Sequence, residues 1–361
     1  MKKSLKIIFL VLLIAEALVT LLAAYGGIFN PRYFYALPAM VSMTFPAWVV
    51  ITPVMMLIAV VTNRRLALIP AATMLLCIGP FFDVCPLNLN RSHHTDKQGF
   101  SLLSYNVLYC ENYLDRSSAI EDSPTIRAIL DSDADVVCLQ ETLDIKGDRF
   151  RGITPELVDS LFTRYPYRIY NNSHLGILSK YSIDTIAAPS LPGATATMMI
   201  ADVHLADRTV RFYNLHLQSI GLTADDKELY KELTRGNADN HLKQAKSSLL
   251  SKLRQAFVNR ANQAALIKEV MGQLKCEYAI VCGDFNDIPG CYAIRTIESE
   301  GLKNAYTDAG FGPVWSYRAD RFYFHIDQVL YNSGLKPTYM TIEKDTGLSD
   351  HLPQFVEFEF R

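Results

Sequence analysis

Side chains that act as acids, bases or metal ligands follow short apolar segments at several points in the second part of the chain. They are Asn106, Glu141, His216, Asp284, Asn286, Asp327, Asp350 and His351. A strand that ends in such a residue holds the side chain on a rigid element at the edge of a sheet. Because several strands are expected to end in this way, we predict that their ends meet in one site.

These side chains together are typical of metal-assisted hydrolysis of phosphate esters. Carboxylate and amide oxygens suit Mg²⁺ or Mn²⁺, which binds through one or two carboxylates together with the substrate phosphate. Histidine beside carboxylates transfers protons or stabilises charge on a phosphoryl group. We therefore expect in-line attack of an activated water on phosphorus, with Mg²⁺ (or Mn²⁺) as the cofactor.

Eight short apolar runs, bounded by polar residues or glycine, predict strands. They cover residues 100–105, 135–140, 176–179, 197–204, 210–216, 278–282, 326–331 and 354–360. Helical patterns occupy 123–132 and 154–163, each opening on a hydroxyl residue followed by proline, and 225–274 with an interruption near 235–237. The mixture lacks strict alternation of strand and helix, which predicts an α+β sandwich of mixed sheets and not a doubly wound fold.

The long helical pattern at 225–274 has two interpretations. Its charges alternate in sign and Leu249, Leu253 and Phe257 form an apolar stripe. This predicts a solvated amphipathic helix packed on a sheet. The alternative is an insertion that covers the substrate.

The amino-terminal part of the chain has the composition of a membrane segment. Between residues 7 and 82 the only charged residues are Glu16, Arg32, Arg64 and Arg65. Three apolar stretches, at 7–29, 36–61 and 66–82, each come near the roughly 20 residues that cross a bilayer. A cleavable signal peptide would explain the first stretch alone. We therefore predict a membrane anchor of about three transmembrane helices over residues 1–90 and a catalytic domain over 91–361.

Basic residues predict the orientation of the anchor. They gather before the first span and in the second loop, at Lys2, Lys3, Lys6, Arg64 and Arg65. Only Arg32 lies in the first loop, so the positive-inside rule places the amino terminus in the cytoplasm. Three crossings then make this an integral protein of the inner membrane whose catalytic domain faces outside, into the periplasm. One crossing fewer would reverse the side.

The second domain is acidic. Six of the 35 basic and two of the 37 acidic residues lie in residues 1–90, which leaves the remainder with a net charge of −6. An acidic domain has no general attraction for a polyphosphate backbone. The charge therefore argues against a processive nucleic-acid enzyme.

The order of several short motifs resembles that of the endonuclease/exonuclease/phosphatase superfamily, which includes deoxyribonucleases, sphingomyelinases and inositol polyphosphate phosphatases. The matching pieces are Ser104-Tyr105-Asn106, Leu139-Gln140-Glu141, Asn214-Leu215-His216, Gly283-Asp284-Phe285-Asn286, Ile326-Asp327 and Ser349-Asp350-His351. The resemblance extends over residues 100–361 and is to a membrane-anchored, bacterial-type member. It implies a four-layer sandwich of two mixed β-sheets flanked by helices, preceded by an α-helical transmembrane segment.

The resemblance also implies metal ligands. Glu141 corresponds to the principal ligand, Asn106 stands beside it, and Asp350 shares the ion. The sequence departs from the family near Asp327, because Gln328 follows it and His325 precedes it where arginine is common. This departure loosens what the resemblance implies about substrate contacts.

The remaining motif residues correspond to catalytic groups. Asp284 orients or deprotonates the attacking water and works with His351 as the general base. Asn286 and His216 hold the phosphate oxygens. Asp327 orients a histidine, which we expect to be His216, by accepting its ring N–H.

Each of these residues also has an ordinary structural explanation. Asn106 can form a turn at a strand end, Asp284 and Asn286 can form an Asx turn, and His216 can be a core histidine. Their joint occurrence in family order favours a phosphoesterase acting on a phospholipid head group, a small phosphorylated molecule or a nucleic acid, with the lipid bilayer as partner of residues 1–90. A nuclease acting on DNA or RNA and a catalytically silent binding or sensor domain remain the alternatives.

Overall fold

The computed structural model describes residues 3–89, 91, 99–111, 123–145, 153–193, 196–221, 241–319, 322–343 and 349–361, with side chains of the helix at 241 described from Ser248 onward. The chain forms two compact units. Unit 1 comprises residues 1–85, 220–264 and 289–296, and unit 2 comprises residues 86–219, 265–288 and 297–361. Unit 1 thus joins the hydrophobic amino-terminal segment to two segments from later in the chain.

Unit 2 contains two mixed six-stranded sheets. The first has the order β13-β14-β1-β2-β4-β3, and β1 and β2 are its parallel pair. Its strands are β1 (Gly99–Asn106), β2 (Val136–Gln140), β3 (Tyr167–Tyr170), β4 (Leu175–Ser179), β13 (Leu335–Ile342) and β14 (Gln354–Phe360).

The second sheet has the order β5-β6-β7-β8-β12-β9, and here β7 and β8 run parallel. Its strands are β5 (Ile183–Ile186), β6 (Thr197–Leu205), β7 (Arg208–His216), β8 (Tyr278–Asp284), β9 (Lys303–Asn304) and β12 (Asp327–Tyr331). Strands β10 (Tyr317–Ala319) and β11 (Phe322–Phe324) pair separately with each other.

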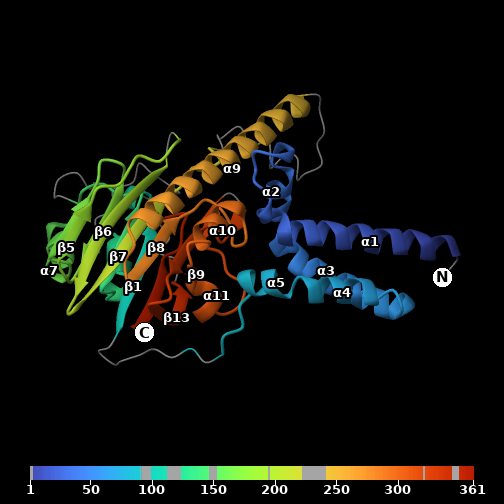
Figure 1. Cartoon of the computed structure of the whole chain (residues 1–361), viewed down its shortest axis with the longest axis horizontal. Coiled ribbons are helices and arrows are strands. Elements are labelled where there is room, and N and C mark those ends of the chain that lie inside the picture. The colour runs from blue at the N-terminus through green and yellow to red at the C-terminus, as the bar shows by residue number, and fades with distance from the viewer. Residues whose placement is uncertain are drawn as a thin grey trace. The chain divides into compact units, whose positions relative to one another are not determined.

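The two sheets face each other across one hydrophobic core. Because successive side chains of a strand point to opposite faces, Phe100 and Leu102 of β1 join Phe212 of β7 in this core. Leu103 and Tyr105 point to the other face, where they pack with helices α6 (Pro124–Ser132) and α7 (Pro155–Arg164). Figure 1 shows these layers of sheet and helix.

Helices also flank the second sheet. Helix α9 (His241–Gln273) buries Ile267 and Val270 in its carboxyl-terminal part. The Leu274 carbonyl that follows accepts hydrogen bonds from the side chains of Arg211 and Tyr213 on β7. The predicted sandwich of two mixed sheets flanked by helices is therefore confirmed.

All eight strands predicted from apolar runs are present, and both shorter helices begin where their caps predict. The Ser123 and Thr154 hydroxyls accept hydrogen bonds from the third backbone N–H that follows each of them. The longest strand that the patterns miss is β13, because Pro337 breaks its strand signal and lies where the register with β14 shifts. The first part of the helix predicted at 225–274 falls on residues 222–240, which lie outside the described residues.

Unit 1 contains a bundle of apolar helices, α1 (Lys3–Tyr25), α2 (Leu37–Ser42), α3 (Phe45–Asn63), α4 (Leu68–Leu76) and α5 (Ile78–Val84). Among the described residues, two helices are long and apolar enough to cross a membrane, at Ser4–Ile28 and Phe45–Asn63. The third predicted span forms α4 and α5 in place of one helix. Figure 1 shows α4 and α5 in succession beside α3, and α4 packs against both α1 and α3.

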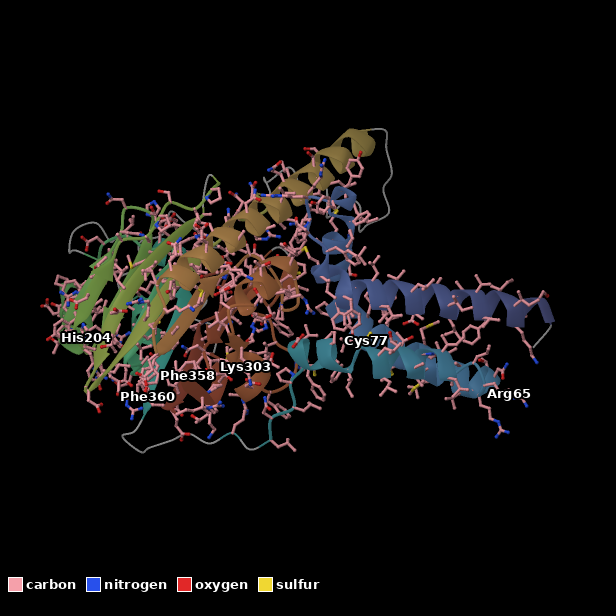
Figure 2. All side chains as sticks on the ribbon, viewed as in Figure 1. Arg65, Cys77, His204, Lys303, Phe358 and Phe360 are labelled. Atoms are coloured by element: carbon pink, nitrogen blue, oxygen red, sulfur yellow. The ribbon has the colours of Figure 1, made fainter. Side chains whose placement is uncertain are left out.

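A proline explains the break in the third stretch. Pro80 has no N–H for the carbonyl four residues earlier, and its ring clashes with that carbonyl, which belongs to Leu76. The Tyr25 hydroxyl donates to the Leu76 carbonyl and so satisfies it. Figure 2 labels Cys77, where α4 and α5 join, and Arg65, which lies in the loop between α3 and α4. Helices α4 and α5 together extend about 25 Å at 1.5 Å per residue, close to the thickness of a bilayer core.

A buried polar cluster joins the two long helices. The Glu16 carboxylate on α1 accepts hydrogen bonds from Thr20 on the same helix and from Thr52 on α3, at 3.1 and 2.5 Å. Hydrogen bonds between helices stabilise membrane bundles, because an apolar surrounding offers no other partner. This cluster accounts for the one acidic residue inside the predicted spans.

The parallel strands β7 and β8 approach each other closely at Gly283. A Cβ atom there would lie 2.0 Å from the Leu215 carbonyl oxygen, and the residue has a φ of +128°. Residues with a side chain rarely adopt this conformation. The glycine of the Gly-Asp-Phe-Asn motif is therefore required by the backbone that carries Asp284.

We expect Gly283→Ala to lower the free energy of unfolding by about 3 kcal/mol, from backbone strain and overpacking together. Gly272→Ala is the matched control, because its Cβ would meet only a Glu300 oxygen at 3.7 Å, within a helix. Alanine should stabilise that position by about 0.5–1 kcal/mol. Thermal unfolding of the full-length protein in detergent measures both, and equal stability of the two variants would contradict this account of Gly283.

Candidate active site

Strand register brings three of the predicted residues to one edge of the second sheet. His216 at the end of β7 pairs with Asp284 at the end of β8 in the parallel ladder. Asp284 in turn pairs with Asp327, the first residue of the antiparallel strand β12. Neighbouring strands therefore place one histidine and two carboxylates side by side.

The first sheet contributes residues from its own parallel pair. Asn106 at the end of β1 lies opposite Gln140 at the end of β2, and Glu141 follows directly. Gln140 Nε2 donates to Asn214 Oδ1 on β7 at 2.7 Å, and Asn214 Nδ2 donates to the Leu139 carbonyl at 2.9 Å. These buried amides connect the two sheets beneath the site.

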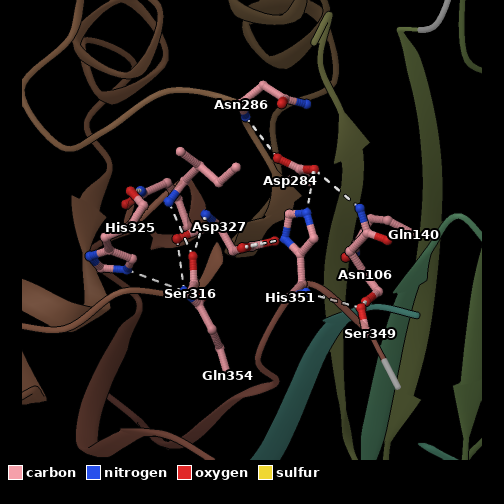
Figure 3. Close-up of polar contacts among 12 residues, drawn as sticks. Asn106, Gln140, Asp284, Asn286, Ser316, His325, Asp327, Ser349, His351 and Gln354 are labelled. Atoms are coloured by element: carbon pink, nitrogen blue, oxygen red, sulfur yellow. Dashed lines mark hydrogen bonds and ion pairs between the residues drawn. The ribbon is translucent and has the colours of Figure 1, made fainter. Parts of the chain in front are cut away.

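Asp284 lies at the centre of the site, and residues from both sheets surround its carboxylate (Figure 3). Asp284 Oδ2 accepts a hydrogen bond from Asn106 Nδ2 at 3.1 Å. The same oxygen lies 3.7 Å from His216 Nε2 and 3.6 Å from His351 Nε2. The predicted meeting of distant sequence motifs at one place is therefore observed.

Burial perturbs the acidity of this carboxyl group. The Asp284 side chain is 2 % exposed, and loss of hydration raises its pKa. The charge on His351 opposes this shift, the charge on Asp327 adds to it and His216 opposes it, and the net result is a pKa of about 6. A carboxylate with a raised pKa is a better proton acceptor than an ordinary aspartate.

Glu141 occupies a strained backbone position. Its φ of +47° is in the left-handed region, which costs a residue other than glycine or asparagine about 1–2 kcal/mol. The carboxylate is 23 % exposed and its Oε1 lies 3.2 Å from Asn106 Nδ2 and 3.9 Å from His216 Nε2. Strain of this kind gathers at functional sites, where the surrounding structure holds it in place.

The structure corrects the partner predicted for Asp327. Its Oδ2 is hydrogen-bonded to Nδ1 of His351 at 2.8 Å, so Asp327 orients His351 and not His216. The prediction was wrong because strand pairing predicts only which backbones are neighbours. The path of the chain through Ser349 and His351, just before β14, decides which ring reaches the carboxylate. The Ser349 hydroxyl directs this loop, since it donates to the Asn106 carbonyl and accepts from the His351 backbone N–H.

The two carboxylates control the charge of His351. Burial by itself lowers the pKa of this imidazole, but the charges of Asp327 and Asp284 outweigh it and raise the pKa to about 10. The imidazolium form is therefore favoured, with Nδ1 donating to Asp327 and Nε2 directed at Asp284. In this form Nε2 carries a proton, while the role of general base expected from the sequence stays a prediction.

Asn286 lies at the rim of the cluster. Its φ of +51° belongs to the left-handed region that asparagine tolerates well. The backbone N–H donates to Asp284 Oδ1 at 2.8 Å, and Nδ2 donates to the Leu217 carbonyl at 3.0 Å. The Asx turn considered for this pair is thus present, and it orients the Asp284 carboxylate.

Asp350 lies between Ser349 and His351. Its backbone carbonyl accepts a hydrogen bond from the Arg318 N–H at 2.8 Å, and its charge makes a minor contribution to the raised pKa of His351. The Asp350 carboxylate is therefore close enough to interact electrostatically with His351. A role as metal ligand stays a prediction.

The donor set fits a hard dication. Asn106 Nδ2 points at oxygens of both Glu141 and Asp284, so two carboxylates converge on the position of one polar atom. Asn106 Oδ1 accepts from the Leu108 N–H, which fixes the amide with its nitrogen directed at the two carboxylate oxygens. Convergent oxygens of this kind suit Mg²⁺ or Mn²⁺. Ligand atoms of Asp284, Asp327 and His351 also lie within 4.8 Å of one another, but the hydrogen bond between the last two occupies one atom of each.

Several supporting residues carry no signal in the sequence. The Ser316 hydroxyl accepts from the backbone N–H groups of Ile326 and Asp327, and Gln354 Nε2 donates to the Asp327 carbonyl at 2.7 Å. The Tyr317 ring packs edge-on against His351 with the centroids 5.0 Å apart. None of these residues belongs to a motif, so only their positions in space reveal them.

A double-mutant cycle tests the Asp327 and His351 pair. Because a hydrogen bond to a charged group contributes about 1.5–3 kcal/mol, Asp327→Asn and His351→Ala should show a coupling energy of that size in unfolding stability. The same cycle with His216→Ala in place of His351→Ala should give a clearly smaller coupling. Chemical unfolding of the full-length protein provides the four stabilities for each cycle. A larger coupling with His216 would restore the assignment predicted from the sequence.

Two family models match the chain. A model described as the endonuclease/exonuclease/phosphatase family matches residues 103–351, and a model described only as a domain of unknown function matches residues 5–84. No curated protein sequence matches.

Solved structures with a similar fold include several bacterial proteins. An endonuclease/exonuclease/phosphatase family protein of Bacteroides thetaiotaomicron is 17% identical with a TM-score of 0.48, over 73% of this chain and 98% of its own. The endonuclease/exonuclease/phosphatase from Beutenbergia cavernae is 15% identical with a TM-score of 0.47, over 73% and 72% of the two chains. A mannosyl-6-phosphatase of Bacteroides thetaiotaomicron is 17% identical with a TM-score of 0.46, over 72% and 100%.

Proposed function

The chain belongs to the endonuclease/exonuclease/phosphatase family, and on this premise we propose that unit 2 is a Mg²⁺- or Mn²⁺-dependent phosphoesterase, anchored to a membrane through residues 1–90. It cleaves P–O ester bonds by in-line attack of water. The observation that carries the proposal is the convergence of Asn106, His216 and His351, from three separate segments, on the buried carboxylate of Asp284.

Glu141 would be the principal ligand of the metal ion, with Asn106 beside it and Asp350 sharing the ion. Two facts support Glu141 as the principal ligand, namely the strained backbone that aims it and the partial exposure of its carboxylate. When bound, a dication of this kind polarises a phosphoryl oxygen and lowers the pKa of a water molecule. Asn106 donates to both Glu141 and Asp284, which couples the metal ligand to the group that acts on water.

Asp284 takes the proton from the attacking water. Its raised pKa, its burial and the hydrogen bond from the Asn286 N–H to the other carboxylate oxygen all support this role. A base needs a pKa near the working pH and a fixed orientation, and Asp284 has both. In this proposal the general base is Asp284, and not His351 as expected from the sequence.

The two histidines stabilise the charge that develops on phosphate. His351 carries a proton because of Asp327 and donates it from Nε2 to a phosphoryl or leaving oxygen. His216 and Asn286 hold the remaining phosphate oxygens from the rim of the site. Asp327 is a positioning residue, because it acts on the substrate through His351.

Activity of the full-length protein in detergent tests this proposal. It should hydrolyse bis-p-nitrophenyl phosphate with added Mg²⁺ or Mn²⁺ and lose activity on chelation. Asp284→Asn should lower kcat by about 10²–10⁴, the usual contribution of a general base. His216→Ala should lower kcat by about 10²–10³, the usual effect of losing one donor to the developing charge on phosphate. Glu141→Gln should lower the affinity for the metal as well, measured by titrating activity against metal concentration.

His204→Ala is the matched control for His216→Ala. His204 lies on the adjacent strand β6 and is paired with Asp184 through Nε2 at 2.8 Å, where its exposed ring makes no contact with the site residues described above. Its variant should keep full activity. A protein that binds metal and phosphate ester but releases no product would instead support a silent sensor domain.

Topology fusions test the membrane anchor. With three crossings, a periplasm-dependent alkaline phosphatase fused after Arg361 should be active, and the same reporter fused after Asn63 should be inactive, because the two points lie on opposite sides. A reporter such as green fluorescent protein, which folds only in the cytoplasm, should show the reverse pattern. Inactivity of both phosphatase fusions would show that the third crossing is missing and that the catalytic domain faces the cytoplasm.

A further inference from the structure

The loop that follows the first span carries exposed aromatic side chains. We call residues 26–42 the anchor loop, and it begins where the span Ser4–Ile28 ends. Tyr33, Phe34 and Tyr35 are 66, 67 and 78 % exposed. Aromatic residues next to a span gather at the interface between lipid and water, where their rings lie among the head groups. With residues 1–90 as the proposed membrane anchor, the anchor loop would lie at head-group level.

The anchor loop packs tightly against residues 289–292 within unit 1. A Cβ atom on the buried residue Gly27 would lie 1.9 Å from the Gly290 carbonyl oxygen, so the two backbones are in direct contact. Asn30 Nδ2 donates to the Tyr292 hydroxyl at 3.1 Å. The Ser42 hydroxyl lies 3.5 Å from the Cys291 thiol, which is itself buried. These contacts hold residues 290–292 at the level of the head groups.

Helix α9 supports the same loop with basic and apolar side chains. Phe257 packs against Ala36 and Ala39, and the Arg254 guanidinium lies 4.9 Å from the centre of the Tyr35 ring. Arg32 in the loop donates to the Asn262 side chain. One arginine of the anchor loop and one of helix α9 therefore lie beside its exposed aromatic side chains. Basic side chains in that position attract anionic lipid head groups.

The covalent chain limits how far the active site can lie from this segment. Only Asp287 and Ile288 separate Asn286 from Pro289. Because a residue extends the chain by at most about 3.6 Å, the Cα atoms of Asn286 and Gly290 lie within about 14 Å of each other. This limit holds for any arrangement of the two units. Asn286, the proposed phosphate-binding residue, therefore lies within about 14 Å of Gly290, a distance comparable to the size of one or two lipid head groups.

A second short connection, between helix α5 and the start of unit 2, also limits the distance between residues of the two units. Helix α5 ends at Val84, and unit 2 begins at Pro86. Within unit 2, Leu87 pairs with Phe311, and Asn88 Nδ2 donates to the Thr307 and Gly310 carbonyls. Unit 2 thus begins two residues after the last apolar helix.

We propose that the substrate is an amphiphile of the same membrane, a lipid whose phosphate ester lies in the head-group layer. This inference rests on the proposed phosphoesterase function and names its substrate class. The reaction adds one water across a P–O bond, because the water oxygen bonds to phosphorus, its proton goes to Asp284, and the leaving oxygen takes a proton from His351. No other reactant is required.

The test compares each lipid with its own deacylated counterpart, using the full-length protein. The lipids are phosphatidylglycerol, phosphatidylethanolamine and phosphatidic acid in mixed detergent micelles, and the counterparts are the water-soluble glycerophosphoesters with the same head groups. At least one lipid should be hydrolysed about tenfold faster than its counterpart, because the membrane segment raises the effective concentration of the lipid at the site. Diluting that lipid with detergent at constant total concentration should lower the rate.

The outcomes separate this inference from the proposed function. Hydrolysis of bis-p-nitrophenyl phosphate without preference for any lipid would overturn the lipid substrate and leave the phosphoesterase intact. Faster cleavage of a single-stranded oligodeoxynucleotide would overturn it in the same way. Loss of activity on every substrate, including bis-p-nitrophenyl phosphate, would overturn both.

A glycine pair tests the contact between the anchor loop and residues 289–292. Gly27→Ala inserts a methyl group where the Gly290 backbone leaves no room, whereas a Cβ on Gly79 in α5 meets nothing within 4 Å. We expect Gly27→Ala to lower lipid hydrolysis about tenfold through this clash, while activity on bis-p-nitrophenyl phosphate stays within about twofold. Gly79→Ala should change neither.

Tyr292→Phe is a milder variant of the same contact, since it removes only the hydroxyl that accepts from Asn30. It should lower lipid hydrolysis by about two- to fivefold, the effect of losing one hydrogen bond. An equal fall on both substrates in Gly27→Ala and in Tyr292→Phe would overturn the role of this contact in presenting a lipid.

Discussion

The arrangement of the site depends on keeping one carboxylate, that of Asp284, buried between two sheets. A buried charge is costly unless polar partners surround it. Here the partners come from β1, from the end of β7 and from the terminal loop, in the form of Asn106, His216 and His351. The carboxylate therefore ties together segments that are far apart in sequence. The same burial raises its pKa, so that the cost in stability provides the basicity that the proposed reaction uses.

The two parallel strand pairs make this meeting possible. Each sheet has one parallel pair, β1 with β2 and β7 with β8, and the functional residues follow the carboxyl ends of these strands. Buried amides between the sheets, at Gln140 and Asn214, keep the two edges level with each other. The rest of the sandwich supplies the hydrophobic core that fixes this alignment. Strain at Glu141 is tolerated because the surrounding hydrogen bonds determine its position.

Unit 1 adds a second constraint that the domain boundary in the sequence does not reveal. Residues 289–296 follow the Gly-Asp-Phe-Asn motif after a short connection, yet they pack with the loop that follows helix α1. The segment therefore lies by chain order in the predicted catalytic domain and by packing in unit 1. If unit 1 is the proposed membrane anchor, this arrangement links the position of the bilayer to the position of the proposed phosphate-binding residues.

The sequence by itself determined eight of the strands, where the shorter helices begin, and which side chains belong to the candidate site, because apolar periodicity, capping residues and motif spacing are local properties. Asn106, Glu141, His216, Asp284 and His351 were all identifiable in this way. Only the tertiary structure decided that Asp327 orients His351, that Ser316 and Gln354 support Asp327, and that Gly27 packs on Gly290. Those contacts join residues from distant parts of the chain. Their partners are chosen by the packing of loops and sheets, which no local pattern encodes.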